Sequence, residues 1–273
     1  MIGIAIGKGF STVRDALARG LVKLGVSPNV LTVFGAVCNL AAGACLALGS
    51  ATSFSWTLKV RPLNDYHPSA YPLLAGVLLF LCAAGDMLDG AVARLTGKST
   101  TFGAFLDSTL DRFSDFFIYL GIAFYFALRG NVTHTLLPFV CIFWATMISY
   151  TRARAEDLIR SCTVGYWQRG ERMVGMLCAS FACNIPALLW QQALLPLFTV
   201  LARIRYTYRS SSGQPFETDP RKTGRALDRL KWWAYPRKTW QYDVMSGIYI
   251  AFLIFAPIPA SFDPIGKALG LGG

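Results

Sequence analysis

Residues 85–115 read GDMLDGAVARLTGKSTTFGAFLDSTLDRFSD, in which aspartates stand at the ends of two otherwise apolar segments. Residues three or four apart share a helix face, so Asp86 and Asp89 form one stripe, while Asp107 and Asp111 form another. The turn LTGKSTT is short, which predicts antiparallel helices whose stripes meet at one end. A carboxylate inside a membrane costs about 2.5 to 3.5 kcal/mol at a helix centre. Such a cluster therefore needs cations or water around it.

The composition places these segments in a membrane. Hydrophobic residues make up 54% of the 273 residues and charged residues only 15%, against about 25% in a typical soluble domain. The apolar residues fall in runs close to the roughly 20 residues that cross a hydrocarbon core. We therefore expect an all-α, polytopic membrane protein built on a six-transmembrane-helix bundle. Its predicted spans are 30–49, 70–90, 104–128, 134–152, 172–186 and 187–204.

The two flanks of this bundle differ from it in composition. Residues 1–29 place apolar and basic residues on opposite sides of a helix, which predicts an N-terminal amphipathic helix at the membrane interface. Residues 30–206 are expected to form the membrane domain. Residues 207–273 are expected to be a basic, aromatic, cytoplasmic extension. Its apolar stretch from Val244 to Ala256 is short for a span, so it is interpreted as re-entrant, interfacial or packed against a partner.

Charge indicates the orientation and the anionic partner. Lysine and arginine are concentrated in alternate connections, which predicts a multi-pass protein of the plasma membrane with its N-terminus and active site in the cytoplasm. The net charge of +11 is not accompanied by a nucleic-acid recognition motif, so the lipid bilayer is the favoured partner and nucleic acid is not. The seven cysteines form no CxxC pair and are interpreted as packing residues.

Two kinds of chemistry fit the four carboxylates. Hard oxygen donors suit Mg²⁺ or Mn²⁺, and paired metal ions about 3.5 to 4 Å apart commonly serve phosphoryl transfer. An ion-coupled membrane transporter also needs carboxylates within the membrane. Burial alone does not choose between them. The predicted position at one membrane face, rather than at the midplane, counts against transport.

The spacing of residues 86–111 resembles the signature DxxDGxxAR(x8)GxxxDxxxD of the CDP-alcohol phosphatidyltransferase family, and all eight fixed positions match. The resemblance extends over residues 10–206 and includes SPNVLT before the first span. It does not cover the C-terminal extension. The resemblance implies an enzyme that transfers a phosphatidyl group from CDP-diacylglycerol, or a similar CDP-lipid, to an alcohol.

The same resemblance implies roles for individual residues. An acceptor hydroxyl would attack the β-phosphorus of the CDP-lipid and CMP would leave, with Asp111 as the general base. Two metal ions, Mg²⁺ or Mn²⁺, would be bound by Asp86, Asp89, Asp107 and Asp111. The CDP-lipid would be bordered by Gly90, Ala93, Arg94 and Gly103. Pairing as a homodimer is also implied.

The acceptor is indicated by residues 149–174, SYTRARAEDLIRSCTVGYWQRGERMV. They resemble the SYxxARAE and ERxER region of phosphatidylinositol-phosphate synthases, although Gln168 departs from that pattern. The resemblance implies inositol phosphate as the acceptor, contacted by Ser149, Arg152, Arg172 and Arg203. The positive-inside rule would also place arginines here. Glycerol phosphate, as in a phosphatidylglycerophosphate synthase, is the alternative, followed by unphosphorylated alcohols.

Overall fold

The computed structural model describes residues 2–50, 70–97, 100–212, 227, 233, 235, 237, 239–256 and 258–271, with side chains from residue 12 onward. The regular elements in these ranges are all helices, which confirms the all-α class. They are α1 (Ile2–Lys23), α2 (Pro28–Leu48), α3 (Tyr71–Thr96), α4 (Thr101–Ala127), α5 (Val132–Glu156), α6 (Arg169–Phe181), α7 (Ile185–Leu194), α8 (Pro196–Ser211), α10 (Trp240–Phe255) and α11 (Pro264–Ala268).

Several of these helices are long and apolar enough to cross a membrane. Four candidates are found in the described ranges: α2, α3, α5 and the continuous segment Ile185–Ser211 that joins α7 to α8. Of the other two predicted spans, α4 has 27 residues but carries charged side chains in its first half, and α6 has only 13 residues. The chain is therefore a multi-pass membrane protein, whereas the count of six spans stays a prediction.

Local signals in the sequence set the helix ends around the α3–α4 turn. Gly97 ends α3 with a φ of 64°, a left-handed conformation that glycine adopts without steric cost. The Thr100 side chain then caps α4 by accepting a hydrogen bond of 2.9 Å from the Gly103 amide. This turn reverses the chain, so the carboxyl end of α3 and the amino end of α4 lie at the same end of the molecule.

Two glycines let α2 and α4 pack with their backbones in contact. A Cβ atom built on Gly43 would collide with the backbone of Phe117, and one on Gly121 would collide with the backbone of Gly43. Close approach of this kind is how small residues bring membrane helices together. This contact holds α4 against α2 at positions that follow Asp107 and Asp111 along α4.

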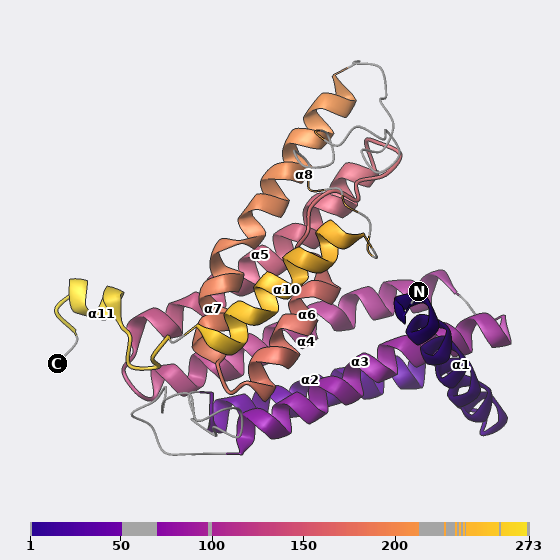
Figure 1. The fold of residues 1–273 in the computed structure, drawn as a ribbon, viewed down its shortest axis with the longest axis horizontal. Helices are drawn as coiled ribbons and strands as arrows, with labels where there is room; N and C mark the ends of the chain where they lie inside the picture. Colours follow the sequence, from indigo (N-terminus) through magenta and orange to yellow (C-terminus); the bar gives the residue numbers. More distant parts are fainter. Residues whose placement is uncertain are drawn as a thin grey trace.

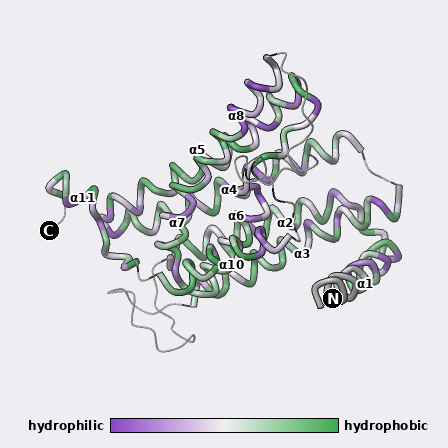
Figure 2. Tube along the Cα trace, turned by 45° about the horizontal axis from the view of Figure 1, so that its top comes forward, coloured by the Kyte–Doolittle hydropathy of each residue, from purple (hydrophilic) through white to green (hydrophobic). Residues whose placement is uncertain are grey.

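The helices form two groups that diverge toward one end (Figure 1). In one group α3 and α4 both pack on α2, and α1 lies against α3; in the other, α5 packs against α7 and α8. Between the groups lies α6, which contacts α3 on one side and α7 and α10 on the other. Apolar residues run along most of α5 and α10, and hydrophilic residues gather toward the outer end of α8 (Figure 2).

The N-terminal flank is helical, as expected. Ala18 of α1 is fully buried and packs with Ala91 and Val92 of α3, while Val13 and Leu17 are more than half exposed. The exposed apolar side chains agree with an interfacial helix, although the membrane placement itself stays a prediction.

The C-terminal flank packs against the helices of the predicted membrane domain. Helix α10 packs against α6 and α7 within the molecule, and the following segment reaches the amino end of α5, where Asn131 Nδ2 donates to the Ala260 carbonyl over 2.9 Å. The extension therefore runs along the core from one end to the other. Residues 209–225, whose Gly, Pro, Ser and charge content predicts a soluble linker, lie outside the described residues from position 213 onward.

Candidate active site

Aspartates from α3 and α4 meet around one guanidinium group. Arg169, the first residue of α6, donates from Nη1 to Asp86 Oδ2 over 2.8 Å, and its Nη2 lies 2.7 Å from Asp111 Oδ1. Asp86 belongs to α3 and Asp111 to α4, so the two predicted stripes do face a common space. The antiparallel turn between the helices is what brings these distant positions together.

Helix α2 supplies the third wall of this space. Thr32 Oγ1 donates to Asp89 Oδ2 over 3.1 Å, and a Cβ atom on Gly35 would lie 3.2 Å from Asp86 Oδ1. Asp107 lies one turn before Asp111 on α4 and interacts electrostatically with Asp86 and Arg169. All four predicted aspartates therefore share one electrostatic environment.

The charges at this site do not balance. Arg169 is only 23% exposed at its side chain and pairs with two of the carboxylates, and Arg112 Nη2 lies 3.6 Å from Asp111 Oδ2. Among the described residues, two guanidinium groups thus face four aspartates, which leaves a formal surplus equal to the charge of one divalent cation. Carboxylate oxygens are the donors that Mg²⁺ and Mn²⁺ prefer. The donor set and its charge therefore fit a divalent metal.

The four aspartate carboxylates are nevertheless not close enough together to coordinate one ion jointly. Within the described ranges, no three histidine, cysteine or acidic side chains come together closely enough to hold an ion. The position of Arg169 explains this, because its guanidinium lies between Asp86 and Asp111 and bonds to both. A metal ion bound by both Asp86 and Asp111 would share these carboxylates with Arg169.

The residues expected to border the CDP-lipid surround the α3–α4 turn. Ala93 is partly exposed and Arg94 is exposed, and the Arg94 Nη1 atom would lie 3.4 Å from a Cβ on Gly90. Gly103 stands at the start of α4, where a Cβ would lie 3.4 Å from Asn29 Oδ1 of α2. These small residues leave the backbone accessible beside the aspartates, as a phosphate site requires.

The residues expected to contact the acceptor have different surroundings. Ser149 donates to the Ala145 carbonyl of its own helix over 3.3 Å, and exposed Arg152 pairs with Glu156 over 3.0 Å. Arg203 is buried and donates to the carbonyls of Val164 and Ile148, which ties α8 to α5 and to the loop before α6. Arg203 is still close enough to Arg152 and Arg172 for their charges to interact.

Arg172 is the most informative of these residues. Its side chain is 3% exposed, and its Nη2 lies 2.9 Å from Asp115 Oδ2 of α4. Its Nε and Nη1 atoms are buried and have no hydrogen-bond partner among the described residues. Buried donors of an arginine normally find acceptors, so these two unpartnered N–H groups are unusual for a buried arginine.

Sequence reasoning did not find every residue of the site. It missed the contact of Thr32 with Asp89, and it treated Arg169 only as one of several cytoplasmic arginines. It also gave no specific partner to Asp115, which the structure pairs with Arg172. The only available signal was that Arg169 and Arg172 lie within one helical turn of each other. Their reach to α3 and α4 depends on tertiary packing.

Comparisons with known proteins identify the family. The sequence profile described as CDP-alcohol phosphatidyltransferase matches residues 25–204. The chain belongs to the CDP-alcohol phosphatidyltransferase family. It is therefore a membrane transferase of phospholipid biosynthesis, as the motif at residues 86–111 implied.

Relatives of this phosphatidyltransferase include enzymes that make inositol lipids. It is 35% identical over 192 residues to the archaetidylinositol phosphate synthase of Pyrococcus horikoshii, covering 70% of this chain and 88% of the relative. It is 33% identical over 189 residues to the phosphatidylinositol phosphate synthase of Mycobacterium tuberculosis, covering 68% and 76% of the two chains.

Solved structures agree with this placement. A crystal structure of the M. tuberculosis phosphatidylinositol phosphate synthase with CDP-DAG bound gives a TM-score of 0.60 at 25% identity, covering 74% of this chain and 96% of that one. A structure of that protein in complex with manganese and citrate gives 0.57 at 25% identity, covering 71% and 88%. The bound CDP-DAG and manganese are properties of those structures.

Proposed function

We propose that this phosphatidyltransferase transfers the phosphatidyl group of CDP-diacylglycerol to inositol phosphate and releases CMP. The observation that carries the acceptor choice is Arg172, a buried arginine with two unpartnered N–H groups beside the charges of Arg152 and Arg203. Arginine binds phosphate through paired hydrogen bonds. The phosphate of a phosphorylated substrate would accept hydrogen bonds from the two unpartnered N–H groups of Arg172. The names of the relatives support inositol phosphate over glycerol phosphate as that substrate.

Divalent metal is part of this proposal. Asp86, Asp89, Asp107 and Asp111 would hold Mg²⁺ or Mn²⁺, two ions in the family pattern. When bound, the metal would neutralise phosphate charge and polarise the P–O bond that breaks. The formal surplus of negative charge around Arg169 supports this assignment.

The chain's own residues would position the acceptor and move its proton. Arg172, Arg203, Arg152 and Ser149 would hold the acceptor phosphate and direct its hydroxyl toward the β-phosphorus. Asp111, whose side chain is 14% exposed, would accept the hydroxyl proton. A P–O bond would then form to the acceptor as the pyrophosphate P–O bond to CMP breaks. Gly90, Ala93, Arg94 and Gly103 would border the CDP-lipid.

We further propose a location consistent with water-soluble acceptors. The active site would open to the cytoplasm from the plasma membrane, with α1 at the inner surface, and the chain would pair as a homodimer. The exposed apolar side chains of α1 support the interfacial position.

The acceptor is tested by measuring CMP release from the purified, detergent-solubilised protein. CDP-diacylglycerol and Mg²⁺ are supplied in every tube, with inositol phosphate, glycerol phosphate, inositol or serine added separately. We expect release with inositol phosphate only. Release with glycerol phosphate alone would identify a phosphatidylglycerophosphate synthase, and release with inositol or serine alone would refute a phosphorylated acceptor.

The assignment of Asp111 as the general base is tested with the variant Asp111→Asn, which keeps the shape of the side chain but removes its basicity. Because a general base commonly contributes about 10² to 10⁴ in rate, we expect CMP release to fall by that factor. The matched control is Asp157→Asn, since Asp157 is 60% exposed at the end of α5. Normal turnover by Asp111→Asn would refute its assignment as the base.

A further inference from the structure

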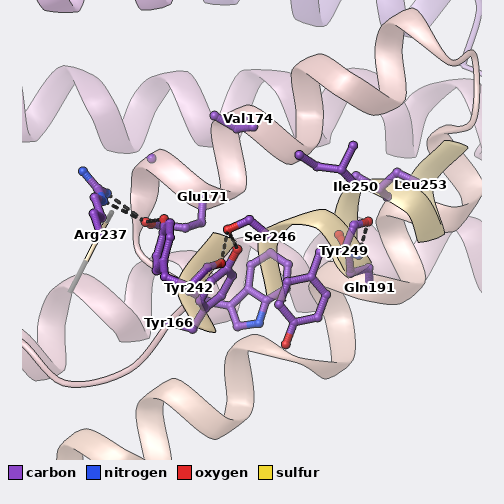
Figure 3. A pocket seen from close by; sticks show the side chains of 13 residues that line it. Tyr166, Glu171, Val174, Gln191, Arg237, Tyr242, Ser246, Tyr249, Ile250 and Leu253 are labelled. Carbon is purple, nitrogen blue, oxygen red and sulfur yellow. Dashed lines mark hydrogen bonds and ion pairs between the residues drawn. The ribbon is translucent and has the colours of Figure 1, made fainter. Parts of the chain in front are cut away.

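Glu171 is a buried carboxylate that lies between Arg169 and Arg172 in the sequence. Its side chain is 5% exposed, and its Oε1 atom accepts hydrogen bonds from Arg237 Nη2 over 2.9 Å and Nε over 3.1 Å. The hydroxyl of Tyr242 donates to the same oxygen over 2.6 Å. Figure 3 shows Arg237 and Tyr242 converging on Glu171. We call this group of three residues the Glu171 clamp.

The clamp joins the catalytic domain to a part of the chain that the family profile does not match. That profile ends at residue 204, whereas Arg237 and Tyr242 belong to the C-terminal extension. The extension is fixed elsewhere too: Gln191 Nε2 donates to the Tyr249 carbonyl over 3.1 Å, and Asn184 Nδ2 donates to the Leu253 carbonyl over 2.8 Å. Helix α10 is thus attached to the α6–α7 pair along its length.

Packing between α10 and α6 is incomplete close to the clamp. A pocket of about 350 Å³ lies there, walled by residues such as Val174 of α6 and Ile250 of α10, with Glu171 and Arg237 also lining it (Figure 3). Beside this space, the polar contacts of Glu171 link the first turn of α6 to the extension, and Tyr166, just before α6, adds a hydrogen bond of 2.8 Å to Ser246.

That first turn supplies the arginines of the site. Arg169 contacts Asp86 and Asp111, and Arg172 pairs with Asp115 over 2.9 Å. We propose that Arg237 and Tyr242 are positioning residues of the active site, which act by holding Glu171 so that both arginines keep their partners. This inference rests on the proposed function, in which the aspartates bind the metal.

The electrostatic reason is competition for the arginines. A buried carboxylate is costly unless it is paired, and the Oε2 atom of Glu171 has no partner among the described residues. Without Arg237, Glu171 would form an ion pair with Arg169 or Arg172, the cationic side chains nearest to it along α6. Their contacts with the aspartates would weaken, and the charge at the reaction centre would change.

The test is a double-mutant cycle on the full-length protein in detergent. The variants are Arg237→Gln, Glu171→Gln, their combination, the conservative Arg237→Lys and the ring-preserving Tyr242→Phe. The measurements are Mn²⁺ affinity by electron paramagnetic resonance and the kcat and KM of CMP release. Controls are Arg154→Gln, in an exposed ion pair on α5, and Tyr208→Phe, at a 72% exposed position on α8.

We expect Arg237→Gln to lower kcat about tenfold while the KM for CDP-diacylglycerol changes less than about twofold. Mn²⁺ should bind about threefold more tightly, because a loosened Arg169 competes less for Asp86 and Asp111. Arg237→Lys should recover part of the kcat, and Tyr242→Phe should lower it in the same direction. With Glu171→Gln already present, Arg237→Gln should have no further effect.

Two results would overturn the inference, and a third would refute the proposed function on which it rests. Equal effects of Arg237→Gln with and without Glu171→Gln would show that Arg237 does not act through Glu171. Unchanged kcat and Mn²⁺ affinity in both Arg237→Gln and Tyr242→Phe would show that the clamp does not position the site. A wild-type protein that binds no Mn²⁺ would refute the proposed metal site itself, so the two failures are distinguishable.

Discussion

At the scale of single residues, Arg169 determines the state of the carboxylate cluster. Its guanidinium bonds to Asp86 and Asp111 and takes the central position among the aspartates. The planar group with several N–H donors suits this bridging of two carboxylates from different helices. Arg169 therefore serves as an internal counter-ion of Asp86 and Asp111, and a divalent cation at the proposed site would compete with it.

This competition gives a prediction for Arg169→Gln. Removing a positive charge that contacts two carboxylates should strengthen Mn²⁺ binding by about three- to tenfold, since like charges repel at this range even with strong screening. Titration of Mn²⁺ followed by electron paramagnetic resonance measures the change. The exposed control Arg154→Gln should bind Mn²⁺ as the wild type does. Weaker binding by Arg169→Gln would show that Arg169 supports the metal site rather than competing for it.

At the scale of helices, the contact between α2 and α4 fixes the platform of the site. Gly43 and Gly121 bring the two backbones together with no room for a side chain. Membrane helices gain stability from such close packing rather than from burial away from water.

We predict that Gly121→Ala separates α2 from α4 and destabilises the protein by about 1 to 3 kcal/mol, the usual cost of overpacking. Thermal unfolding in detergent should show a lower transition temperature. CMP release should fall because Asp107 and Asp111 of α4 move away from Asp89, which Thr32 holds beside α2. The matched control is Gly20→Ala on α1, where a Cβ would meet nothing within 4 Å. An unchanged transition temperature for Gly121→Ala would contradict the described contact.

A second contact between elements is made by Asp263, beyond α10. Its Oδ1 atom accepts hydrogen bonds from the Thr133 amide and the Gly266 amide, and its Oδ2 atom accepts one from the Val132 amide, each over 2.9 Å. Asp263 thus caps α5 and α11 together. Burial raises the pKa of Asp263, but the hydrogen bonds from Thr133, Gly266 and Val132 outweigh it and lower the pKa to about 2.

The lowered pKa predicts how stability depends on pH. Because the folded state holds the carboxylate ionised more strongly than the unfolded chain, whose Asp pKa is about 3.9, Asp263 stabilises the protein above that value. This contribution should be lost as the pH falls from about 4 to about 2. Thermal unfolding of Asp263→Asn and wild type should differ most near neutral pH and converge at the acid end. A difference independent of pH would contradict the assignment.

At the scale of the whole molecule, the extension connects the two ends of the core. It contacts Glu171 near the aspartates and Asn131 at the amino end of α5, and the N- and C-termini lie at opposite ends in Figure 1. The 16 residues of α10 extend about 24 Å, which is shorter than a hydrocarbon core of about 30 Å, but the chain continues beyond α10 to the amino end of α5.

We therefore predict that α11 lies on the side of the membrane opposite to the active site. Reporter domains that are active only in the cytoplasm or only outside it, fused after residue 271, should show an external position. The same reporters fused before residue 1 should show a cytoplasmic one. A cytoplasmic signal from both fusions would mean that the whole extension stays on the inner side, as its basic composition first suggested.

The sequence by itself determined the family, the all-α membrane class and the aspartates of the candidate site. These follow from short-range patterns: the spacing of Asp86 to Asp111 within two adjacent helices, and the length of the apolar runs. Such features depend on helix geometry and solvation, which are set locally.

Only the tertiary structure decided which distant groups meet these aspartates. Arg169 reaches Asp86 across 83 positions in the sequence, Thr32 reaches Asp89 across 57, and Arg237 reaches Glu171 across 66. A charged side chain in a linear sequence carries no mark of its partner, because the partner is chosen by how helices pack. For the same reason, composition left open whether Val244 to Ala256 is re-entrant, interfacial or packed against a partner, whereas the structure packs α10 on α6 and α7.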